Sequence, residues 1–300
     1  GVVACIRPWN YPLLQIERKV FPALIAGNTV VLKPASNTPL TAIIYAEIMD
    51  EVGFPKGVFN LVTGSGSKTG DYLAGHEDVD VISFTGSTAV GTKMYEKAAD
   101  GIKQIVLELG GKSPLIYLKG GDLKAAVKQA MNTVLNNQGQ TCTALTRLLV
   151  PTDELEQTKK EILAFYEDEV VIGDPTKEDT KVGPLVSADQ RDTVLQYIEE
   201  GQKEGAEILI GGNKVEGPGY FVEPTVFVHA TNNMKISQEE IFGPVLTVLT
   251  YDDVADAIKI GNDSVYGLSG AVVGPKEEAI KVARQLRTGN IIVNGASRVP

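Results

Sequence analysis

Short apolar runs alternate with helix-like periodicity along the first third of the chain. The runs at residues 1–6, 29–33, 58–63, 79–85 and 105–109 are rich in Val, Ile and Leu. Helical patterns follow at residues 39–52, after Gly64-Ser65-Gly66, and from residue 88 to about residue 99. Near-continuous apolar strands separated by helices predict a parallel sheet covered by helices on both faces.

The same alternation continues with different spacing after Gly111. Strands are expected at residues 115–118, 148–151, 207–210, 225–228 and 245–250, and helices at residues 122–135, 152–167, 187–205 and 252–260, before a last strand, helix and strand that end at residue 293. Asp122 is expected to cap the helix that follows it. The pattern predicts a second α/β domain, so we divide the chain at a turn near residue 110 into domains 1–110 and 111–300. In parallel sheets, ligands bind beyond the carboxyl ends of the strands.

Composition narrows the class of protein. The 300 residues contain 38 acidic and 28 basic side chains, a net charge of -10, which argues against a nucleic acid or an anionic membrane as a partner. No apolar run reaches the roughly 18 residues of a membrane span. Two cysteines are too few for a disulfide framework, so a reducing, cytoplasmic location is expected. A strand at each end of the sequence leads us to expect a piece of a longer chain.

Cys142 is the first candidate for chemistry. It lies in NQGQTCT, residues 137–143, a polar, glycine-containing segment between a helix and a strand. This context fits a nucleophile, and a small buried side chain is the alternative. Cys5 lies inside an apolar strand and is expected to be buried. The only histidines, His76 and His229, have no accompanying motif and are expected at the surface, so a carboxylate is the expected base for Cys142.

Two glutamates are candidates for a site. Glu108 lies in an apolar strand that ends at a double glycine. Burial would raise the pKa of its carboxyl group towards the range of a general base, whereas a salt bridge or alternation towards a solvated face is the other interpretation. Glu240 lies in QEEIFGPV, residues 238–245, where a solvated acid before a strand is the plain alternative.

Two turns after apolar strands have the chemistry to bind ligands. FTGSTAVG, residues 84–91, joins a strand to a helix, and the amides of a helix N-terminus favour a phosphate group. Its spacing is neither the dinucleotide fingerprint nor a P-loop, so an ordinary capped turn is the alternative. PWNYP, residues 8–12, contains the only tryptophan, Trp9. The Asn10 amide at this strand exit is suited to donate to a developing oxyanion, and a turn plugged by an aromatic ring is the alternative.

Taken together, these segments resemble the aldehyde dehydrogenase superfamily. PWNYP, VVLKPAS, FTGSTAVG, LELGGKSP, NQGQTCT, EEIFGPV and NDSVYGLSG occur in the family's order with family-like separations and span essentially the whole chain. The resemblance implies a partial, Rossmann-like cofactor domain over residues 1–110 and an α/β catalytic domain over residues 111–300. Typical members also have a further N-terminal segment and a C-terminal tail that helps to form the oligomer, so the full-length protein is expected to be a homodimer or homotetramer.

The resemblance implies oxidation of an aldehyde to a carboxylic acid with NAD or NADP. The Cys142 thiolate would attack the carbonyl group, while the Asn10 amide and the Cys142 backbone N–H hold the oxyanion of the thiohemiacetal. Hydride transfer to the nicotinamide would leave a thioester, and Glu108 would activate the water that hydrolyses it. The scheme needs no imidazole, and no metal site is expected.

The same matching assigns residues to the cofactor. Those expected to contact it are Lys33 at the adenosine ribose, Gly86 and Ser87 at the pyrophosphate, Glu240 at the nicotinamide ribose with Phe242 beside it, and Trp9 in the cofactor cleft. Strict NAD enzymes of the family often have Glu at the position of Ser36. Because Ser can donate to a 2′-phosphate that Glu would repel, we expect NADP to be accepted.

Arg18 is the candidate for substrate selection. It lies on an expected helix with Tyr11 on a neighbouring turn, and in the family this face borders the aldehyde tunnel. Members that resemble succinate-semialdehyde or lactaldehyde dehydrogenases have Arg here, so small polar or acidic aldehydes are expected. A surface salt bridge with Glu17 is the alternative.

Two other functions compete with hydrolytic aldehyde oxidation. One is a related acylating dehydrogenase, in which coenzyme A or phosphate takes the acyl group in place of water. The other is a catalytically silent structural or binding protein with the same fold. Many acylating relatives lack the acid at the position of Glu108, and a silent protein has no need of Cys142, Glu108 and Asn10 together, so the sequence favours hydrolysis.

Overall fold

Residues Gly1–Gly110 form a compact unit around one sheet. In the computed structural model, which describes residues 1–295, its strands are β1 (Val2–Ile6), β2 (Thr29–Lys33), β3 (Phe59–Leu61), β4 (Val81–Thr85) and β5 (Gln104–Glu108). Its helices are α1 (Pro12–Ile25), α2 (Leu40–Glu51), the π-helical turn η1 (Gly66–Gly70), α3 (Asp71–Gly75) and α4 (Thr88–Asp100). The strands pair in the order β3-β2-β1-β4-β5, and every pair is parallel.

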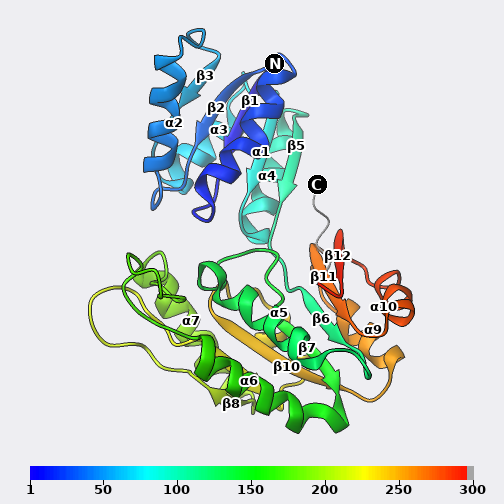
Figure 1. Ribbon diagram of the computed structural model, residues 1–300. Helices are drawn as coiled ribbons and strands as arrows, with labels where there is room; N and C mark the ends of the chain where they lie inside the picture. Colours follow the sequence, from blue (N-terminus) through cyan, green and yellow to red (C-terminus); the bar gives the residue numbers. More distant parts are fainter. Residues whose placement is uncertain (296–300) are drawn as a thin grey trace. The chain divides into compact units, whose positions relative to one another are not determined.

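Helices cover both faces of this first sheet (Figure 1). Side chains alternate along a strand, so Val3 and Cys5 of β1 pack in a core with α1 and α2, whereas Ala4 and Ile6 pack in another with α3 and α4. The central strand β1 is therefore apolar on both faces, which explains its continuous apolar run in the sequence. The predicted parallel sheet between two helical layers is confirmed.

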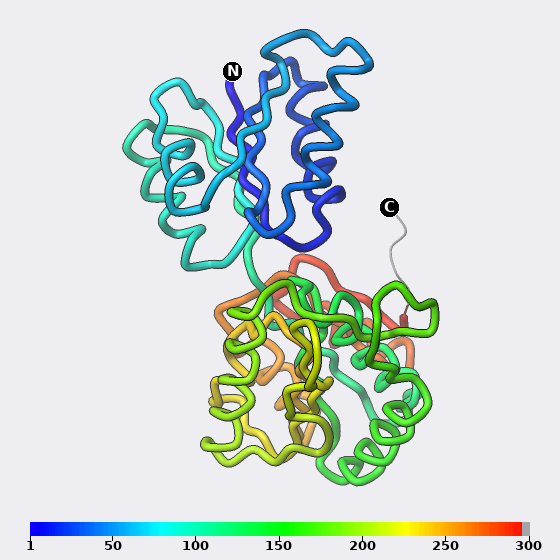
Figure 2. Tube along the Cα trace, turned by 90° about the vertical axis from the view of Figure 1, so that its left-hand side faces the viewer, coloured from blue at the N-terminus to red at the C-terminus, as the bar shows by residue number. Residues whose placement is uncertain are grey.

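The second unit begins at Gly111 and is built on a larger sheet. Its strands are β6 (Pro114–Tyr117), β7 (Arg147–Pro151), β8 (Glu207–Ile210), β9 (Thr225–Val228), β10 (Val245–Tyr251), β11 (Ser269–Val273) and β12 (Asn290–Val293). Its helices are α5 (Leu123–Leu135), η2 (Asn136–Gly139), η3 (Thr152–Glu154), α6 (Leu155–Glu169), α7 (Ala188–Lys203), α8 (Lys235–Gln238), α9 (Val254–Asn262) and α10 (Lys276–Ala283). Figure 2 shows each unit as one continuous stretch of chain, blue to cyan and then green to red.

The second sheet has the order β12-β11-β6-β7-β10-β9-β8. All its pairs are parallel except β8 with β9, which is antiparallel. One face packs against α5 and α6, and the other packs against α7, α9 and α10. The α/β class predicted for this half is confirmed, with the sheet mixed at its β8 edge.

Capping side chains fix where several helices begin. Asp122 Oδ1 accepts a hydrogen bond from the Ala125 amide at 2.9 Å at the start of α5. Ser87 Oγ does the same for the Val90 amide at 3.4 Å at the start of α4. Each cap satisfies an amide that has no partner inside its helix. The predicted Asp122 cap is confirmed.

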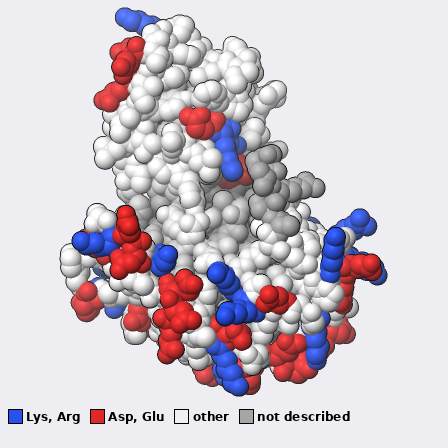
Figure 3. All heavy atoms as spheres, viewed as in Figure 1, with Lys and Arg blue, Asp and Glu red and all other residues white. Residues whose placement is uncertain are grey.

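The two units differ in their surfaces. Helix α2 exposes Leu40, Ile44 and Ile48, which lie one turn apart on one side of the helix. On the face drawn in Figure 3, the first unit is largely uncharged, whereas acidic and basic side chains cover much of the second.

Within residues 1–295, no helix combines the length and apolarity that crossing a membrane requires.

Candidate active site

In the first unit, the predicted site residues gather at one edge of the sheet. Because all five strands are parallel, their carboxyl ends lie along the same edge. The segments leaving these ends contain the predicted site residues Trp9 and Asn10 after β1, Lys33 and Ser36 at and after β2, Gly86 and Ser87 after β4, and Glu108 at the end of β5. This is the edge at which doubly covered parallel sheets bind their ligands.

Lys33 and Ser36 present different groups at this edge. Lys33 is buried, and burial lowers the pKa of its ammonium group. Ser36 is exposed, and its hydroxyl donates to the Gly64 carbonyl oxygen at 3.0 Å. This hydrogen bond ties the loop after β2 to the loop after β3.

The turn between β4 and α4 is shaped by Gly86. A Cβ at this position would lie 2.5 Å from the Phe84 ring, so only glycine fits without a shift. The Gly86 amide donates to the Glu108 carbonyl oxygen at 3.1 Å, which fixes the turn against the end of β5. Ser87 then caps α4 and is exposed, so the helix N-terminus is accessible to an anionic group.

The segment after β1 has an unusual backbone. Asn10 is buried, and the next residue, Tyr11, adopts a left-handed conformation with φ 47° just before α1. The Thr38 hydroxyl donates to the Trp9 carbonyl oxygen at 3.2 Å. A left-handed conformation is costly for a residue with a side chain and is often found at functional sites.

Of the two interpretations of Glu108, the structure agrees with alternation towards a solvated face. Its side chain is exposed, because accessibility alternates along β5 and this edge strand turns every second residue outwards. Arg18 on α1 is exposed as well, and no ion pair joins it to Glu17 in the described part of the chain.

In the second unit, the predicted site residues lie at the amino edge of the sheet. Cys142 precedes β7, Glu240 and Phe242 precede β10, and Gly111 precedes β6. These three strands are parallel neighbours, so their amino ends lie along one edge. The predicted site residues of this half therefore lie at the edge opposite to the one named by the carboxyl-end rule.

Glycines bring the three segments of this edge together. A Cβ at Gly111 would lie 2.3 Å from the Cys142 carbonyl oxygen, and a Cβ at Gly139 would lie 2.0 Å from the Gly243 carbonyl oxygen. In both places, one backbone packs directly on another, which any larger residue would prevent. The Gly111 amide also donates to Glu240 Oε1 at 3.2 Å. Gly111 thus contacts both segments, packing on the Cys142 backbone and donating a hydrogen bond to the Glu240 side chain.

Cys142 lies at the end of a strained segment. Asn137, Gln138 and Gly139 are all left-handed, with φ of 50°, 54° and 69°. Gln140 is buried and braces the turn, since its Nε2 donates to the Asn137 carbonyl oxygen at 3.1 Å and its Oε1 accepts from the Val186 amide at 3.1 Å. The thiol is half-buried, whereas Cys5 is fully buried and its thiol pKa is raised by burial.

The segment of Glu240 and Phe242 is held from α7. Gln190 Nε2 donates to the carbonyl oxygens of Ile241, at 3.2 Å, and Phe242, at 2.9 Å. Phe242 is left-handed with φ 55°. Burial raises the pKa of Glu240, and the Gly111 hydrogen bond and the Lys112 charge oppose this rise.

The sequence interpretation missed two polar residues at this edge, Gln190 and Lys112. Gln190 had no local signal, because a glutamine on a helix is ordinary. Lys112 had one, since it is a charged residue between a double glycine and a buried strand. His76 is half-buried and His229 is exposed, and neither lies on a segment of this edge.

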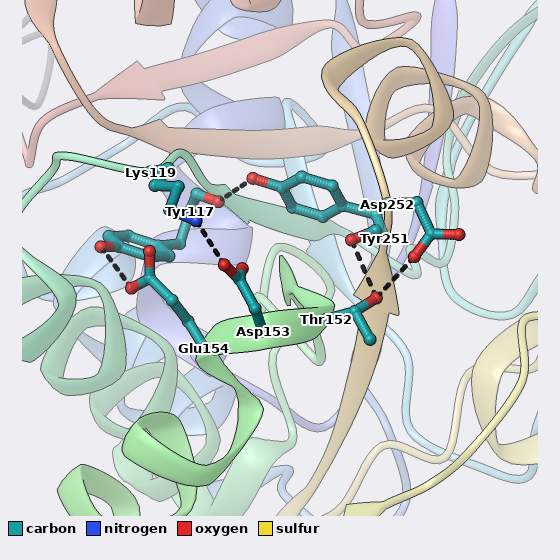
Figure 4. A network of polar contacts seen from close by, with 7 residues as sticks. All are labelled: Tyr117, Lys119, Thr152, Asp153, Glu154, Tyr251 and Asp252. Atoms are coloured by element: carbon teal, nitrogen blue, oxygen red, sulfur yellow. Dashed lines mark hydrogen bonds and ion pairs between the residues drawn. The ribbon is translucent and has the colours of Figure 1, made fainter.

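A network of polar contacts lies at the carboxyl edge of the second sheet (Figure 4). Beyond the carboxyl ends of β6, β7 and β10, the Tyr117 hydroxyl donates to Glu154 Oε2 at 3.0 Å, and the Tyr251 hydroxyl donates to the Tyr117 carbonyl oxygen at 2.6 Å. The Thr152 hydroxyl bonds to the Tyr251 carbonyl oxygen and to Asp252. These polar groups satisfy one another, which indicates a structural role.

The fold and these two edges define a class of protein. A parallel, doubly covered sheet with ligand-binding turns at its carboxyl edge is typical of nucleotide-binding α/β proteins, and here it is joined to a second α/β unit that presents a half-buried thiol. The model of the aldehyde dehydrogenase family matches residues 1–300. The chain belongs to the aldehyde dehydrogenase family.

Known proteins similar to this chain support the same assignment. A curated relative from Staphylococcus haemolyticus, provisionally named an aldehyde dehydrogenase, is 48% identical over 307 residues. A betaine aldehyde dehydrogenase from Staphylococcus aureus, solved with NAD+, is 40% identical with a TM-score of 0.96 over 99% of this chain and 60% of its own. An aldehyde dehydrogenase from Mycobacterium tuberculosis, also solved with NAD+, is 44% identical with a TM-score of 0.96 over 100% of this chain and 62% of its own. The chain spans 64% of the length of the curated relatives it matches.

Proposed function

We propose that the protein is an NAD(P)-dependent aldehyde dehydrogenase that oxidises an aldehyde to a carboxylic acid. The observation that carries this proposal is Cys142, a half-buried thiol on a segment held backbone to backbone against Gly111. A thiol that is partly accessible and fixed on a rigid turn is suited to nucleophilic attack. Membership of the family and the NAD+ in two similar structures support the choice of reaction and cofactor.

In the proposed reaction, the Cys142 thiolate attacks the aldehyde carbon. The Asn10 side-chain amide and the Cys142 backbone N–H donate to the resulting oxyanion. A nicotinamide cofactor, when bound, would accept the hydride that leaves the former aldehyde carbon. After hydride transfer, the acyl group is a thioester on Sγ, and Glu108 takes a proton from the water that attacks it. The products are the carboxylic acid and the free thiol, and the exposed position of Glu108 supports a role that requires contact with water.

The carboxyl edge of the first sheet suits a dinucleotide. The α4 N-terminus behind Gly86 and Ser87 offers amides to the pyrophosphate. We assign the buried Lys33 to the adenosine ribose, with Ser36 on the following loop beside any 2′-phosphate. Glu240 of the second unit is assigned to the nicotinamide ribose and Phe242 to the ring beside it.

We further propose that the substrate is a small polar or acidic aldehyde. Arg18 is exposed on α1, the helix that follows Tyr11, and its guanidinium is available to a carboxylate or hydroxyl group of the substrate. A cationic aldehyde, such as the one that gives the S. aureus relative its name, would be repelled by this charge. We also expect the protein to be a homo-oligomer located in the cytoplasm. Sedimentation of the purified protein would check the oligomeric state.

The test follows NADH and NADPH absorbance with succinate semialdehyde, lactaldehyde, betaine aldehyde and hexanal. Cys142→Ala should abolish turnover, whereas Cys5→Ala, which removes a fully buried thiol, should retain it. Arg18→Leu should reduce kcat/KM for the acidic aldehyde selectively. Turnover that survives in Cys142→Ala would refute the mechanism, and turnover that requires coenzyme A would favour the acylating reaction.

A further inference from the structure

The turn that precedes Cys142 is strained, and the proposed reaction gives no role to the side chain that braces it. Asn137, Gln138 and Gly139 are consecutive residues in the left-handed region. Such conformations persist only where the surrounding structure holds them, and they are common at functional sites. Gln140 follows these three residues, is 3% exposed and lies two positions before Cys142. The groups that hold this turn therefore decide where Cys142 lies.

Gln140 joins the turn to itself and to a second segment. Its backbone amide donates to the Asn137 carbonyl oxygen at 3.0 Å, and its side-chain Nε2 donates to the same oxygen at 3.1 Å. Asn137 Nδ2 donates back to the Gln140 carbonyl oxygen at 3.0 Å. Gln140 Oε1 accepts from the Val186 amide at 3.1 Å. One buried side-chain amide thus connects the first residue of the turn to a segment outside it.

The segment that Gln140 contacts is itself fixed. Val186 is followed by Ser187, the N-cap of α7, whose Oγ accepts from the Gln190 amide at 3.2 Å. The attachment point of the Gln140 side chain is therefore the start of a capped helix of 16 residues.

Cys142 is held from its other side by Gly111. The close packing of the Cys142 carbonyl oxygen on Gly111 fixes the backbone after the thiol, as the Gln140 side chain fixes the backbone before it. The Cys142 backbone N–H lies between these two attachments along the chain. A donor to an oxyanion has to lie about 2.7–3.1 Å from the oxygen, so its position is sensitive to both.

We propose that Gln140 is a positioning residue, whose buried side-chain amide holds the turn before Cys142 so that the Cys142 backbone N–H meets the oxyanion formed during attack. The inference rests on the proposed function, which assigns this N–H to the oxyanion. Gln140 acts through the turn and not on the substrate. Loss of its amide should therefore slow reactions of the thiol that pass through an oxyanion and leave its other reactions unchanged.

Two reagents that need no cofactor separate these two kinds of reaction. With 4-nitrophenyl acetate, the Cys142 thiolate forms an Sγ–C bond through an oxyanion, and 4-nitrophenolate leaves with the electrons of the broken C–O bond. With iodoacetamide, the thiolate displaces iodide, and no oxyanion forms. The parent protein for both assays is Cys5→Ala, in which Cys142 is the remaining cysteine.

Gln140→Met keeps the length of the side chain and removes its hydrogen bonds. In the Cys5→Ala parent, it should be acylated by the ester about tenfold more slowly, whereas alkylation should stay within about twofold of the parent rate. In aldehyde oxidation, kcat should fall about tenfold and KM for NAD+ should not change. A general loosening of the fold would instead change acylation, alkylation and KM together.

Asn60→Leu is the matched control for loss of a side-chain amide that donates to carbonyl oxygens. Asn60 is half-buried in the first unit, and its Nδ2 donates to the carbonyl oxygens of Val30 at 3.3 Å and Gly57 at 2.9 Å. Acylation and alkylation of Cys142 should both keep the parent rates in this variant.

Gln140→Glu, assayed at pH 9, is the second variant and is used alone if Gln140→Met does not fold. Its ionised carboxylate keeps an acceptor for the Val186 amide but turns an oxygen towards the Asn137 carbonyl oxygen, so it should show the same selective loss. Acylation at the parent rate, or equal losses of acylation and alkylation, would overturn the inference. A protein that is acylated by the ester but oxidises no aldehyde with NAD+ or NADP would overturn the proposed function instead.

Discussion

At the residue scale, the second unit contains two buried cations, Arg147 and Lys112, whose pKa values burial lowers to different levels. The Arg147 guanidinium donates to the carbonyl oxygens of Lys112, Ile260 and Gly261 and to Asn232 Oδ1, at 2.9 to 3.0 Å. Burial lowers the pKa of Arg147 to about 10, and the charge of Asp263 opposes this change, so the guanidinium stays charged at neutral pH. Lys112, a point charge without this fork of donors, has a pKa of about 7 and titrates near neutrality.

The lowered pKa of Lys112 makes stability depend on pH. Unfolded lysine has a pKa of about 10.4. Between pH 7 and pH 10, the unfolded chain therefore binds a proton that the folded chain does not, so the unfolding free energy rises with pH, by up to a few kcal/mol. Lys112→Met should remove this rise and be more stable than the wild type at pH 7. Urea unfolding of both proteins at pH 7, 8 and 9 measures it, and parallel pH slopes would contradict the expectation.

Ser36 is the residue at which the choice of cofactor should be adjustable. Its exposed hydroxyl lies on the loop after β2 that also follows Lys33. In Ser36→Glu, a carboxylate should repel the 2′-phosphate of NADP, so kcat/KM with NADP should fall at least about tenfold while NAD is retained. Steady-state rates with both cofactors give the ratio. A wild-type protein that already binds NADP far more weakly than NAD would show the expectation to be wrong.

At the scale of elements, the hydrophobic pattern predicts positions better than it predicts partners. The apolar runs at residues 29–33 and 207–210 coincide with β2 and β8, and the Asp122 cap lies where it was expected. The antiparallel direction of β8 was not visible, because pairing direction depends on a distant strand. Glu108 is similar: its neighbours are apolar, but the position of β5 at the sheet edge decides its exposure. Local pattern fixes an element, and tertiary packing fixes its surroundings.

Gly139 is where an element depends on one missing side chain. Gly139→Ala would combine a left-handed backbone with a Cβ 2.0 Å from the Gly243 carbonyl oxygen. We expect a loss of about 3 kcal/mol in stability, from both the strain and the overpacking. The control is Gly53→Ala, whose φ of 73° is similar but whose Cβ would meet no atom within 4 Å, and it should cost about 1 kcal/mol. Equal losses in thermal unfolding would show that the contact with Gly243 is unimportant.

At the scale of the whole molecule, the two sheets present their candidate site residues on opposite kinds of edge. The first sheet uses the carboxyl ends of β1, β2, β4 and β5, and the second uses the amino ends of β6, β7 and β10. The connection explains this: the chain leaves β5 at its carboxyl end and enters β6 at its amino end through Gly110 and Gly111. Because β5 connects directly to β6, residues at the carboxyl edge of the first sheet are followed within a few positions by residues at the amino edge of the second.

This arrangement predicts where a cofactor should slow amide hydrogen exchange. Added NAD+ should protect residues 9–11, 33–36 and 86–90 at the carboxyl edge of the first sheet, and residues 239–243 at the amino edge of the second. The network around Tyr117, Glu154 and Tyr251 lies at the carboxyl edge of the second sheet and should exchange equally with and without NAD+. Hydrogen-exchange mass spectrometry at saturating NAD+ reads all these segments in one experiment. Protection confined to residues 117–122 and 251–253 would mean that the cofactor binds at the carboxyl edge of the second sheet, against the assignment of Glu240 and Phe242.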